Sequence, residues 1–115
     1  KILGAKVLQL GITFKENCPD IRNSHAVDVV RGLREFGCDV DIFDPWAEPE
    51  EVEKFYGLKS VKNADVLRFG VYDAVVLAVA HREFTDMDVT KFCDGNAVVF
   101  DIKGSLPREV VDGRL

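Results

Sequence analysis

The chain has 115 residues, of which 47% are hydrophobic, and this fits one compact domain with its own core. The net charge of −5 at pH 7 disfavours a general role in binding nucleic acid or membrane surfaces, and no apolar run approaches the roughly 20 residues that a membrane span requires. The three cysteines, Cys18, Cys38 and Cys93, are widely spaced and lack CxxC or CxxH partners. We therefore expect no disulfide framework, no zinc site and a cytoplasmic location.

The first half of the chain predicts alternating strands and helices. An apolar run at 6–11 is typical of a buried parallel strand. A helix is predicted over 24–37, because apolar residues recur at spacings of three and four between a serine N-cap and a glycine stop. A second strand over 38–45 ends at a proline, and a short helix with early acidic residues follows at 49–57. Residues 58–67 predict a short strand and a helical turn.

The second half continues this alternation. Residues 72–80 carry the strongest strand pattern of the chain, and their apolar character on both faces indicates a central strand. A short helix is expected to open at Thr85–Asp88 and to end near Phe92–Cys93. The last strand is predicted at 96–101, followed by a terminal helical turn at 107–111.

This order predicts one α/β domain over residues 1–115. We expect a three-layer α/β/α fold with a Rossmann-like open parallel sheet of about five strands and right-handed crossovers. The segment 11–24 between the first strand and the first helix is far longer than a routine connection. It lies where such sheets bind their ligands, at the carboxyl ends of the strands. We therefore expect the functional site in this segment.

A dinucleotide-binding domain carries the GxGxxG pattern at the same junction. In this chain Gly11 is followed by Ile12-Thr13-Phe14-Lys15, so the glycines that admit phosphates to the backbone are missing. Asp44 ends the second strand, where such domains place a ribose-binding acid. Without the glycine loop, a local role for Asp44 in an Asp-Pro turn, capping the next helix, is favoured.

Two cations in the long segment, Lys15 and Arg22, precede a helix N-terminus, which is a favourable arrangement for an anion such as phosphate. The alternative is a pair of solvated charges partnered by Glu16 and Asp20, and from the residues alone both interpretations stay open. Lys103 follows the last strand at the same edge of the predicted sheet. It would reach the same anion or lie solvated in a turn, and both interpretations stay open as well.

Four other side chains near this edge are assigned structural roles. A nucleophilic cysteine needs a base or a lowered pKa, and no histidine stands near Cys18 in sequence, so a catalytic role for it is disfavoured. For His81, just past the strongest strand, a capping or loop role is favoured over catalysis. Trp46 and Phe84 are expected to pack rather than to stack on bases.

The pattern Phe14-Lys15-x-x-x-x-Asp20-x-Arg22-x-Ser24 resembles the C-terminal, UDP-binding domain of the UDP-glucose/GDP-mannose dehydrogenases. In that family a strand and a glycine are followed by F-K-x-x-T-x-D-x-R-x-S and a helix. Three later stretches are similar to further family motifs and occur in the same order: Asp44-Pro45, residues 75–84, and Phe100-Asp101-x-Lys103. The resemblance covers essentially the whole chain.

Two departures from the family pattern are visible. Cys18 stands where the family often has threonine, which further weakens a nucleophile role. Ala80-His81-Arg82-Glu83-Phe84 replaces a T-E-W form and looks like the branch that acts on UDP-N-acetylhexosamines in Vi-antigen and O-antigen synthesis. The resemblance thus favours UDP-N-acetylglucosamine or UDP-N-acetylgalactosamine as the substrate of a parent enzyme.

The resemblance implies that the chain is a fragment of a longer NAD-dependent dehydrogenase. That enzyme would oxidise C6 of a UDP-hexose or UDP-N-acetylhexosamine to the uronic acid for polysaccharide biosynthesis. The N-terminal domain would bind most of the NAD, and the N-terminal and central regions would hold the catalytic cysteine, so the fragment alone would be inactive and hold no catalytic residue. A homo-oligomer is expected for the full-length enzyme, with no nucleic-acid or membrane partner.

The resemblance also implies roles at matching positions. Lys15 would contact the substrate diphosphate with Phe14 beside it, and Lys103 would be a second substrate contact. Arg22 would reach the NAD side of the cleft between domains. The two supporting positions, for the loop and the helix start, are Asp20 and Ser24. Two rival interpretations are a free-standing NAD-binding Rossmann module and a receiver-like or structural α/β interaction domain.

Overall fold

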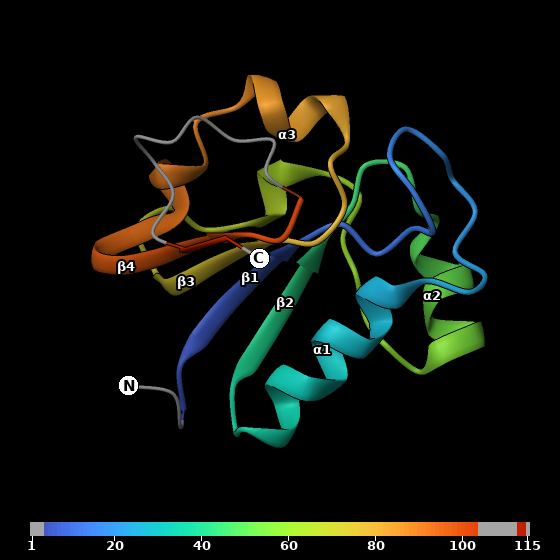
Figure 1. Cartoon of the computed structure of the whole chain (residues 1–115), viewed down its shortest axis with the longest axis horizontal. Coiled ribbons are helices and arrows are strands. Elements are labelled where there is room, and N and C mark those ends of the chain that lie inside the picture. The colour runs from blue at the N-terminus through green and yellow to red at the C-terminus, as the bar shows by residue number, and fades with distance from the viewer. Residues whose placement is uncertain (1–3, 104–112, 115) are drawn as a thin grey trace.

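The computed structural model describes residues 4–103 and 113–114 of the chain. Its centre is one sheet of five parallel strands in the order β2-β1-β3-β4-β5, so β2 forms one edge and β3 lies in the middle (Figure 1). This confirms the predicted Rossmann-like sheet and the central place of its third strand. The strands are β1 (Lys6–Leu10), β2 (Asp39–Phe43), β3 (Tyr72–Leu77), β4 (Cys93–Asp101) and β5 (Gly113–Arg114).

Helices cover both faces of the sheet. Helices α1 (His25–Glu35) and α2 (Pro49–Tyr56) pack on one face, and α3 (Arg82–Asp86) with the 3₁₀ turn η2 (Val89–Phe92) packs on the other. A second 3₁₀ turn, η1 (Ala64–Val66), follows α2. In α1 the N-cap serine predicted from sequence accepts a hydrogen bond from a first-turn amide, and α2 ends at a left-handed glycine, as expected for these cap residues.

Two hydrophobic clusters, one on each face of the sheet, hold these layers together. Alternate residues of β1 enter opposite clusters: Val7 belongs to the cluster that includes Val30 of α1, whereas Leu8 belongs to the one that includes Phe84 of α3. Because successive strand side chains point to opposite faces, a strand covered on both sides is mostly apolar, and the buried Gln9 of β1 donates to the carbonyls of Gly11 and Ala26. This accounts for the continuous apolar runs in the sequence.

The structure corrects three element boundaries. β3 ends at Leu77 rather than near residue 80, because the next two amides both turn to the carbonyl of Leu10. The helix predicted to open at Thr85–Asp88 and to end near Phe92 begins earlier, at Arg82, and is broken after Asp86, where Asp88 caps the separate turn η2. β4 starts three residues before the predicted Asn96.

Two further points concern the C-terminal part and the length of the helices. The expected helical turn at 107–111 lies outside the described residues, and β5 was not among the elements predicted by residue range. Within the described part of the chain, no helix is both long and apolar enough to cross a membrane.

Candidate functional site

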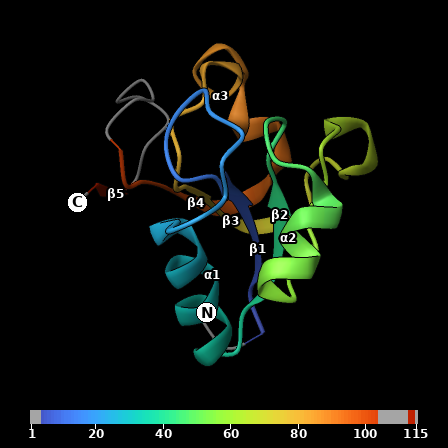
Figure 2. The ribbon, with the colours of Figure 1, turned by 90° about the vertical axis from the view of Figure 1, so that its right-hand side faces the viewer.

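The long segment 11–24 lies at the carboxyl edge of the sheet, above α1 and α2 and beside α3 (Figures 1 and 2). It opens at Gly11, which has φ +103° and donates its amide to the carbonyl of Phe43. A Cβ atom at this glycine would lie 2.5 Å from Cβ and 2.8 Å from the amide nitrogen of Val79. Gly11 is therefore needed for close approach of two chain segments, and the backbone of Val79 occupies the space beside it.

The carboxylate of Asp44 holds together the starts of two loops. Its side chain is fully buried. Oδ2 accepts hydrogen bonds from the amides of Ile12 at 2.7 Å and Thr13 at 3.2 Å. Oδ1 accepts from the amides of Trp46 at 2.7 Å and Ala47 at 3.2 Å. Because a buried charge is tolerated only when it is well hydrogen-bonded, these four donors account for an aspartate at this depth.

His81 connects this carboxylate to the middle of the long segment. Its ring is fully buried, with Nε2 2.9 Å from Oδ2 of Asp44 and 3.1 Å from Oγ1 of Thr13. Nδ1 accepts a hydrogen bond from the amide of Asn17 at 2.9 Å. An amide only donates, so Nδ1 carries no proton and the Nε2–H group faces Asp44.

Asn17 forms a second hydrogen bond to the segment that contains His81, through its side chain. Its Oδ1 accepts a hydrogen bond from the amide of Arg82 at 2.8 Å, and its backbone has φ +55°, a conformation that asparagine tolerates better than most residues. The ring of Trp46 stacks on His81 with centroids 5.9 Å apart, and the guanidinium of Arg82 lies 5.0 Å from the Trp46 ring centroid. We call the linked residues Asp44, His81 and Asn17 the clasp.

Sequence reasoning found part of this arrangement. The local turn role of Asp44 is confirmed by its bonds to residues 46–47. Capping of the next helix is wrong, because the N-cap of α2 is Glu48, and Asp44 instead turns toward the neighbouring loops. The link from Asp44 to His81 and the part played by Asn17 were missed. The available signal was that the first two both follow strands of one parallel sheet.

The predicted substrate residues of the loop lie on its outer side. Phe14 and Lys15 are exposed, with Phe14 49% exposed. The amide of Phe14 donates to the carbonyl of Asp20 at 2.7 Å, which narrows the loop. Ser24 caps α1 and donates its hydroxyl to the carbonyl of Thr13, so it joins the end of the loop to its beginning.

Arg22 and Asp20 form a two-pronged ion pair. Nε and one terminal nitrogen of Arg22 each lie 3.0 Å from a different Asp20 oxygen, and the Arg22 amide donates to the same carboxylate. The hydrogen bonds from Arg22 lower the pKa of Asp20 to about 2. The Arg22 side chain remains 75% exposed. Lys15, by contrast, forms no ion pair with any described residue.

Lys103 lies at the same edge of the sheet, just past β4. Its side chain is exposed, and its amide donates to the buried carboxylate of Asp101 at 2.9 Å. Because β3 separates β1 from β4, the end of β4 stands about 10 Å from the end of β1. The fold thus places Lys103 and Lys15 on one edge without direct contact.

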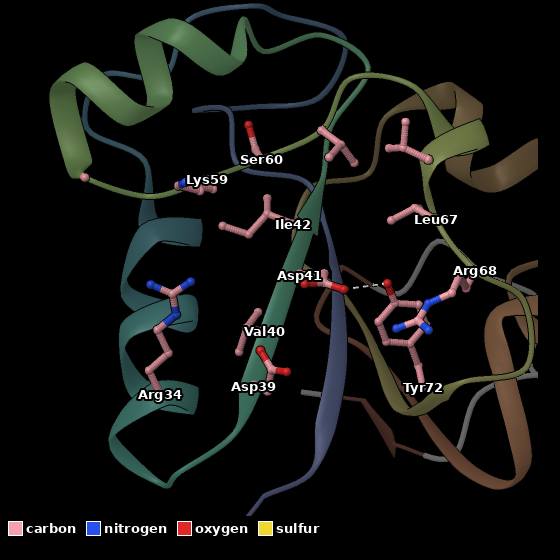
Figure 3. Close-up of a pocket in the computed structure, with 13 residues that line it drawn as sticks. Arg34, Asp39, Val40, Asp41, Ile42, Lys59, Ser60, Leu67, Arg68 and Tyr72 are labelled. Atoms are coloured by element: carbon pink, nitrogen blue, oxygen red, sulfur yellow. Dashed lines mark hydrogen bonds between the residues drawn. The ribbon is translucent and has the colours of Figure 1, made fainter.

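Hollows lie both beside this loop and away from it. Two flank it: one of about 390 Å³ includes Asp20 and Arg22, and one of about 420 Å³ includes Phe14. A larger hollow of about 650 Å³ lies at the outer edge of β2 and contains none of the predicted site residues (Figure 3). No group of three or more potential metal-ligating side chains occurs within the described ranges.

The hollow at β2 has mixed charge. Figure 3 shows Arg34, Lys59 and Arg68 around it. The Tyr72 hydroxyl donates to Asp41 at 2.7 Å, and burial together with this bond raises the pKa of the phenol. Asp41 is therefore engaged within the domain, and Asp39 lies 3.0 Å from Nζ of Lys6.

Fold and loop together define a parallel α/β domain that presents a cation-bearing loop at its ligand edge. Residues 8–108 match the model of the UDP-glucose/GDP-mannose dehydrogenase family, UDP binding domain. The chain belongs to this family, and the matched region is its UDP-binding domain.

Individual relatives agree with this. The chain is 46% identical to a UDP-N-acetyl-D-glucosamine 6-dehydrogenase of Salmonella typhi and 44% identical to one of Pseudomonas aeruginosa, in each case over 97% of this chain and 26% of the relative. A UDP-glucose dehydrogenase structure from Pyrobaculum islandicum matches with a TM-score of 0.73 and 26% identity, over 97% of this chain and 25% of that one. The chain spans about a quarter of the length of these relatives.

Proposed function

We propose that this chain is the UDP-binding part of an NAD-dependent nucleotide-sugar 6-dehydrogenase. The full-length protein would oxidise C6 of a UDP-N-acetylhexosamine to the uronic acid, in two steps, for polysaccharide biosynthesis. The observation that carries the proposal is the match of residues 8–108 to the family's UDP-binding domain. The names of the two relatives with 46% and 44% identity support an N-acetylhexosamine rather than a plain hexose.

For the substrate we propose contacts from Lys15, Phe14 and Lys103. Lys15 is exposed and has no ion-pair partner among the described residues, so its charge is available to a diphosphate. A half-exposed phenylalanine next to it offers an apolar surface to the same ligand. The separation of about 10 Å between strand ends lets Lys103 meet another part of the same extended ligand.

For the cofactor we propose that NAD is held mainly outside this chain. NAD accepts the hydride in this type of reaction. The turn after β1 does not fit a dinucleotide, because Val79 fills the space beside Gly11 that a pyrophosphate would need. Arg22, exposed and oriented by Asp20, would face the NAD side of a cleft closed by the N-terminal domain. The cytoplasmic location and the homo-oligomeric state belong to this proposal.

Titration of the 115-residue chain with UDP and, separately, with NAD tests the proposal by NMR chemical shifts. We expect UDP to shift amides in the loop 11–24 and to bind more tightly than NAD, although binding is weakened by the absence of the other wall of the cleft. Lys15→Ala should reduce UDP affinity about tenfold, while the control Lys54→Ala on α2 leaves it unchanged. Preference for NAD, or unchanged affinity in Lys15→Ala, would contradict the proposal.

Enzymatic activity gives a second test of the proposed function. The isolated chain with UDP-N-acetylglucosamine and NAD should form no NADH, because the catalytic cysteine and the main NAD site are expected elsewhere in the full-length protein. NADH formation by the isolated chain would contradict the proposal that the catalytic cysteine and the main NAD site lie elsewhere in the full-length protein.

A further inference from the structure

We infer that His81 is a positioning residue, which fixes the loop 11–24 by linking Asn17 to the buried carboxylate of Asp44. The consequence for binding rests on the proposed function, in which this loop carries Phe14 and Lys15 to the UDP-sugar.

The first step is that Asp44 is a rigid anchor. Its carboxylate accepts from four backbone amides, belonging to the loops after β1 and β2, at 2.7 to 3.2 Å. The side chain is fully buried, so water offers no alternative partner. A group that forms a hydrogen bond with Asp44 is therefore fixed relative to the ends of β1 and β2.

The second step is that the His81 ring is held in one orientation. The rings of Trp46 and Phe84 lie with centroids 5.9 and 5.5 Å from it, and its exposed fraction is zero. Both nitrogens are engaged: Nε2 faces Asp44 at 2.9 Å, and Nδ1 accepts from Asn17 at 2.9 Å. A ring flip would break both bonds, because the two nitrogens have opposite hydrogen-bonding roles.

The third step is that Asn17 holds the middle of the loop, residues 15–19, against the segment 81–82. Within the described part of the chain, the bonds from Asn17 to residues 81 and 82 are the only hydrogen bonds that join residues 15–19 to a segment outside the loop. Lys15 lies two positions away. Loss of these bonds would leave Lys15 on a freer loop, and ordering that loop would then cost free energy on binding.

A matched pair of variants separates the two functions of the ring. In His81→Gln the side-chain NH₂ takes the place of Nε2–H, so the bond to Asp44 is kept and the acceptor for Asn17 is lost. In His81→Asn the amide oxygen takes the place of Nδ1, so the acceptor is kept and the bond to Asp44 is lost. Asn17→Gly, at an exposed site with positive φ, removes only the side-chain bond to Arg82 and does not disturb the core.

The readouts are amide hydrogen exchange at Asn17 and UDP affinity, both measured on the 115-residue chain. For His81→Gln we expect exchange at Asn17 about tenfold faster and UDP affinity about five- to tenfold weaker, as for the loss of one hydrogen bond. For His81→Asn, in which the acceptor for Asn17 is kept but is no longer anchored to Asp44, we expect exchange and affinity between those of the wild type and those of His81→Gln, although its melting temperature is the lower of the two variants. If His81 acted only through the stability of the fold, UDP affinity would fall most in the less stable variant, His81→Asn. The clasp predicts instead that UDP affinity falls most in His81→Gln.

Asn17→Gly should show faster loop exchange and about threefold weaker UDP binding at an unchanged melting temperature. If both His81 variants fail to fold, exchange of the Asn17 amide in the wild-type chain decides the matter, because this amide donates to His81. Unchanged exchange and unchanged affinity in His81→Gln, or fast exchange of the wild-type Asn17 amide where that variant does not fold, would overturn the inference. If the wild-type chain binds no UDP, the proposed function fails, and the exchange at Asn17 still decides whether the clasp orders the loop.

Discussion

Two concave regions of this domain hold their acidic groups in opposite ways. At the hollow beside β2, the two acids lie at the surface and are paired: Lys6 lies 3.0 Å from Asp39 and 3.3 Å from Asp41, and Asp41 also accepts from Tyr72. The cations that line this hollow, Arg34, Lys59 and Arg68, form no ion pair with a described residue. At the loop 11–24, the buried polar groups are satisfied beneath the surface by the clasp, and the exposed Lys15 has no ion-pair partner among the described residues. The comparison teaches that volume alone does not mark a binding site. Both regions expose cations without an ion-pair partner among the described residues, and of the two only the loop carries its cation on a buried, hydrogen-bonded frame.

The largest expected effect is on the frame of the loop. Asp44→Asn presents an NH₂ group to backbone donors and leaves at least one buried amide without an acceptor, so we expect a loss of about 3 kcal/mol in the free energy of unfolding. Asp41→Asn, in the hollow beside β2, keeps an acceptor for Tyr72 and should cost under about 1 kcal/mol. Urea denaturation measures both values. Equal losses in the two variants would mean that the two regions do not differ as described.

The second effect concerns the close approach at the start of the loop. Gly11→Ala would place a methyl group 2.5 Å from Cβ of Val79 at φ +103°, and we expect a loss of about 2–4 kcal/mol. Gly57→Ala is a matched control, since φ is +68° and no atom lies within 4 Å of its Cβ position. That control should cost about 1 kcal/mol in thermal denaturation. A Gly11→Ala chain as stable as the control would show that the two segments separate easily.

The third prediction compares the contributions of two lysines, one from each region, to UDP affinity. Lys103→Ala should weaken UDP binding about threefold, because a second, solvent-exposed charge contact with the ligand is lost. Lys59→Ala, in the hollow beside β2, should change the affinity less than twofold. Isothermal titration calorimetry on both variants checks this. If the Lys59 variant loses more affinity than the Lys103 variant, the ligand occupies the hollow at β2 instead.

The smallest effect is a change in one pKa. Since the Arg22 hydrogen bonds lower the folded-state pKa of Asp20 to about 2, the pair adds stability above the unfolded-state pKa of about 3.9, and this is lost as the pH falls through 2. Arg22→Gln should raise the pKa of Asp20 toward 3.8 without reaching it, because the backbone amide of residue 22 still donates. A carboxyl NMR titration measures it. An unchanged pKa would show that the amide alone causes the lowering.

The sequence by itself determined the layers of the fold and predicted the place of the site. Strand and helix periodicity, the cap at Ser24 and the left-handed stop at Gly57 depend on near neighbours in the chain, so local patterns are enough to predict them. The missing glycines after Gly11 excluded a dinucleotide loop, and the ordered motifs that include Lys15 and Arg22 identified the family. These are properties of short stretches of residues.

Only the tertiary structure decided how the site is held. Asp44, His81 and Asn17 are far apart in the chain, and they meet because the order β2-β1-β3 brings three strand ends together. No local pattern states which loop partner a buried carboxylate or a histidine nitrogen will choose, since that choice depends on burial and on the competing donors around it. The close approach of Val79 to Gly11 likewise exists only once β1 and β3 are paired.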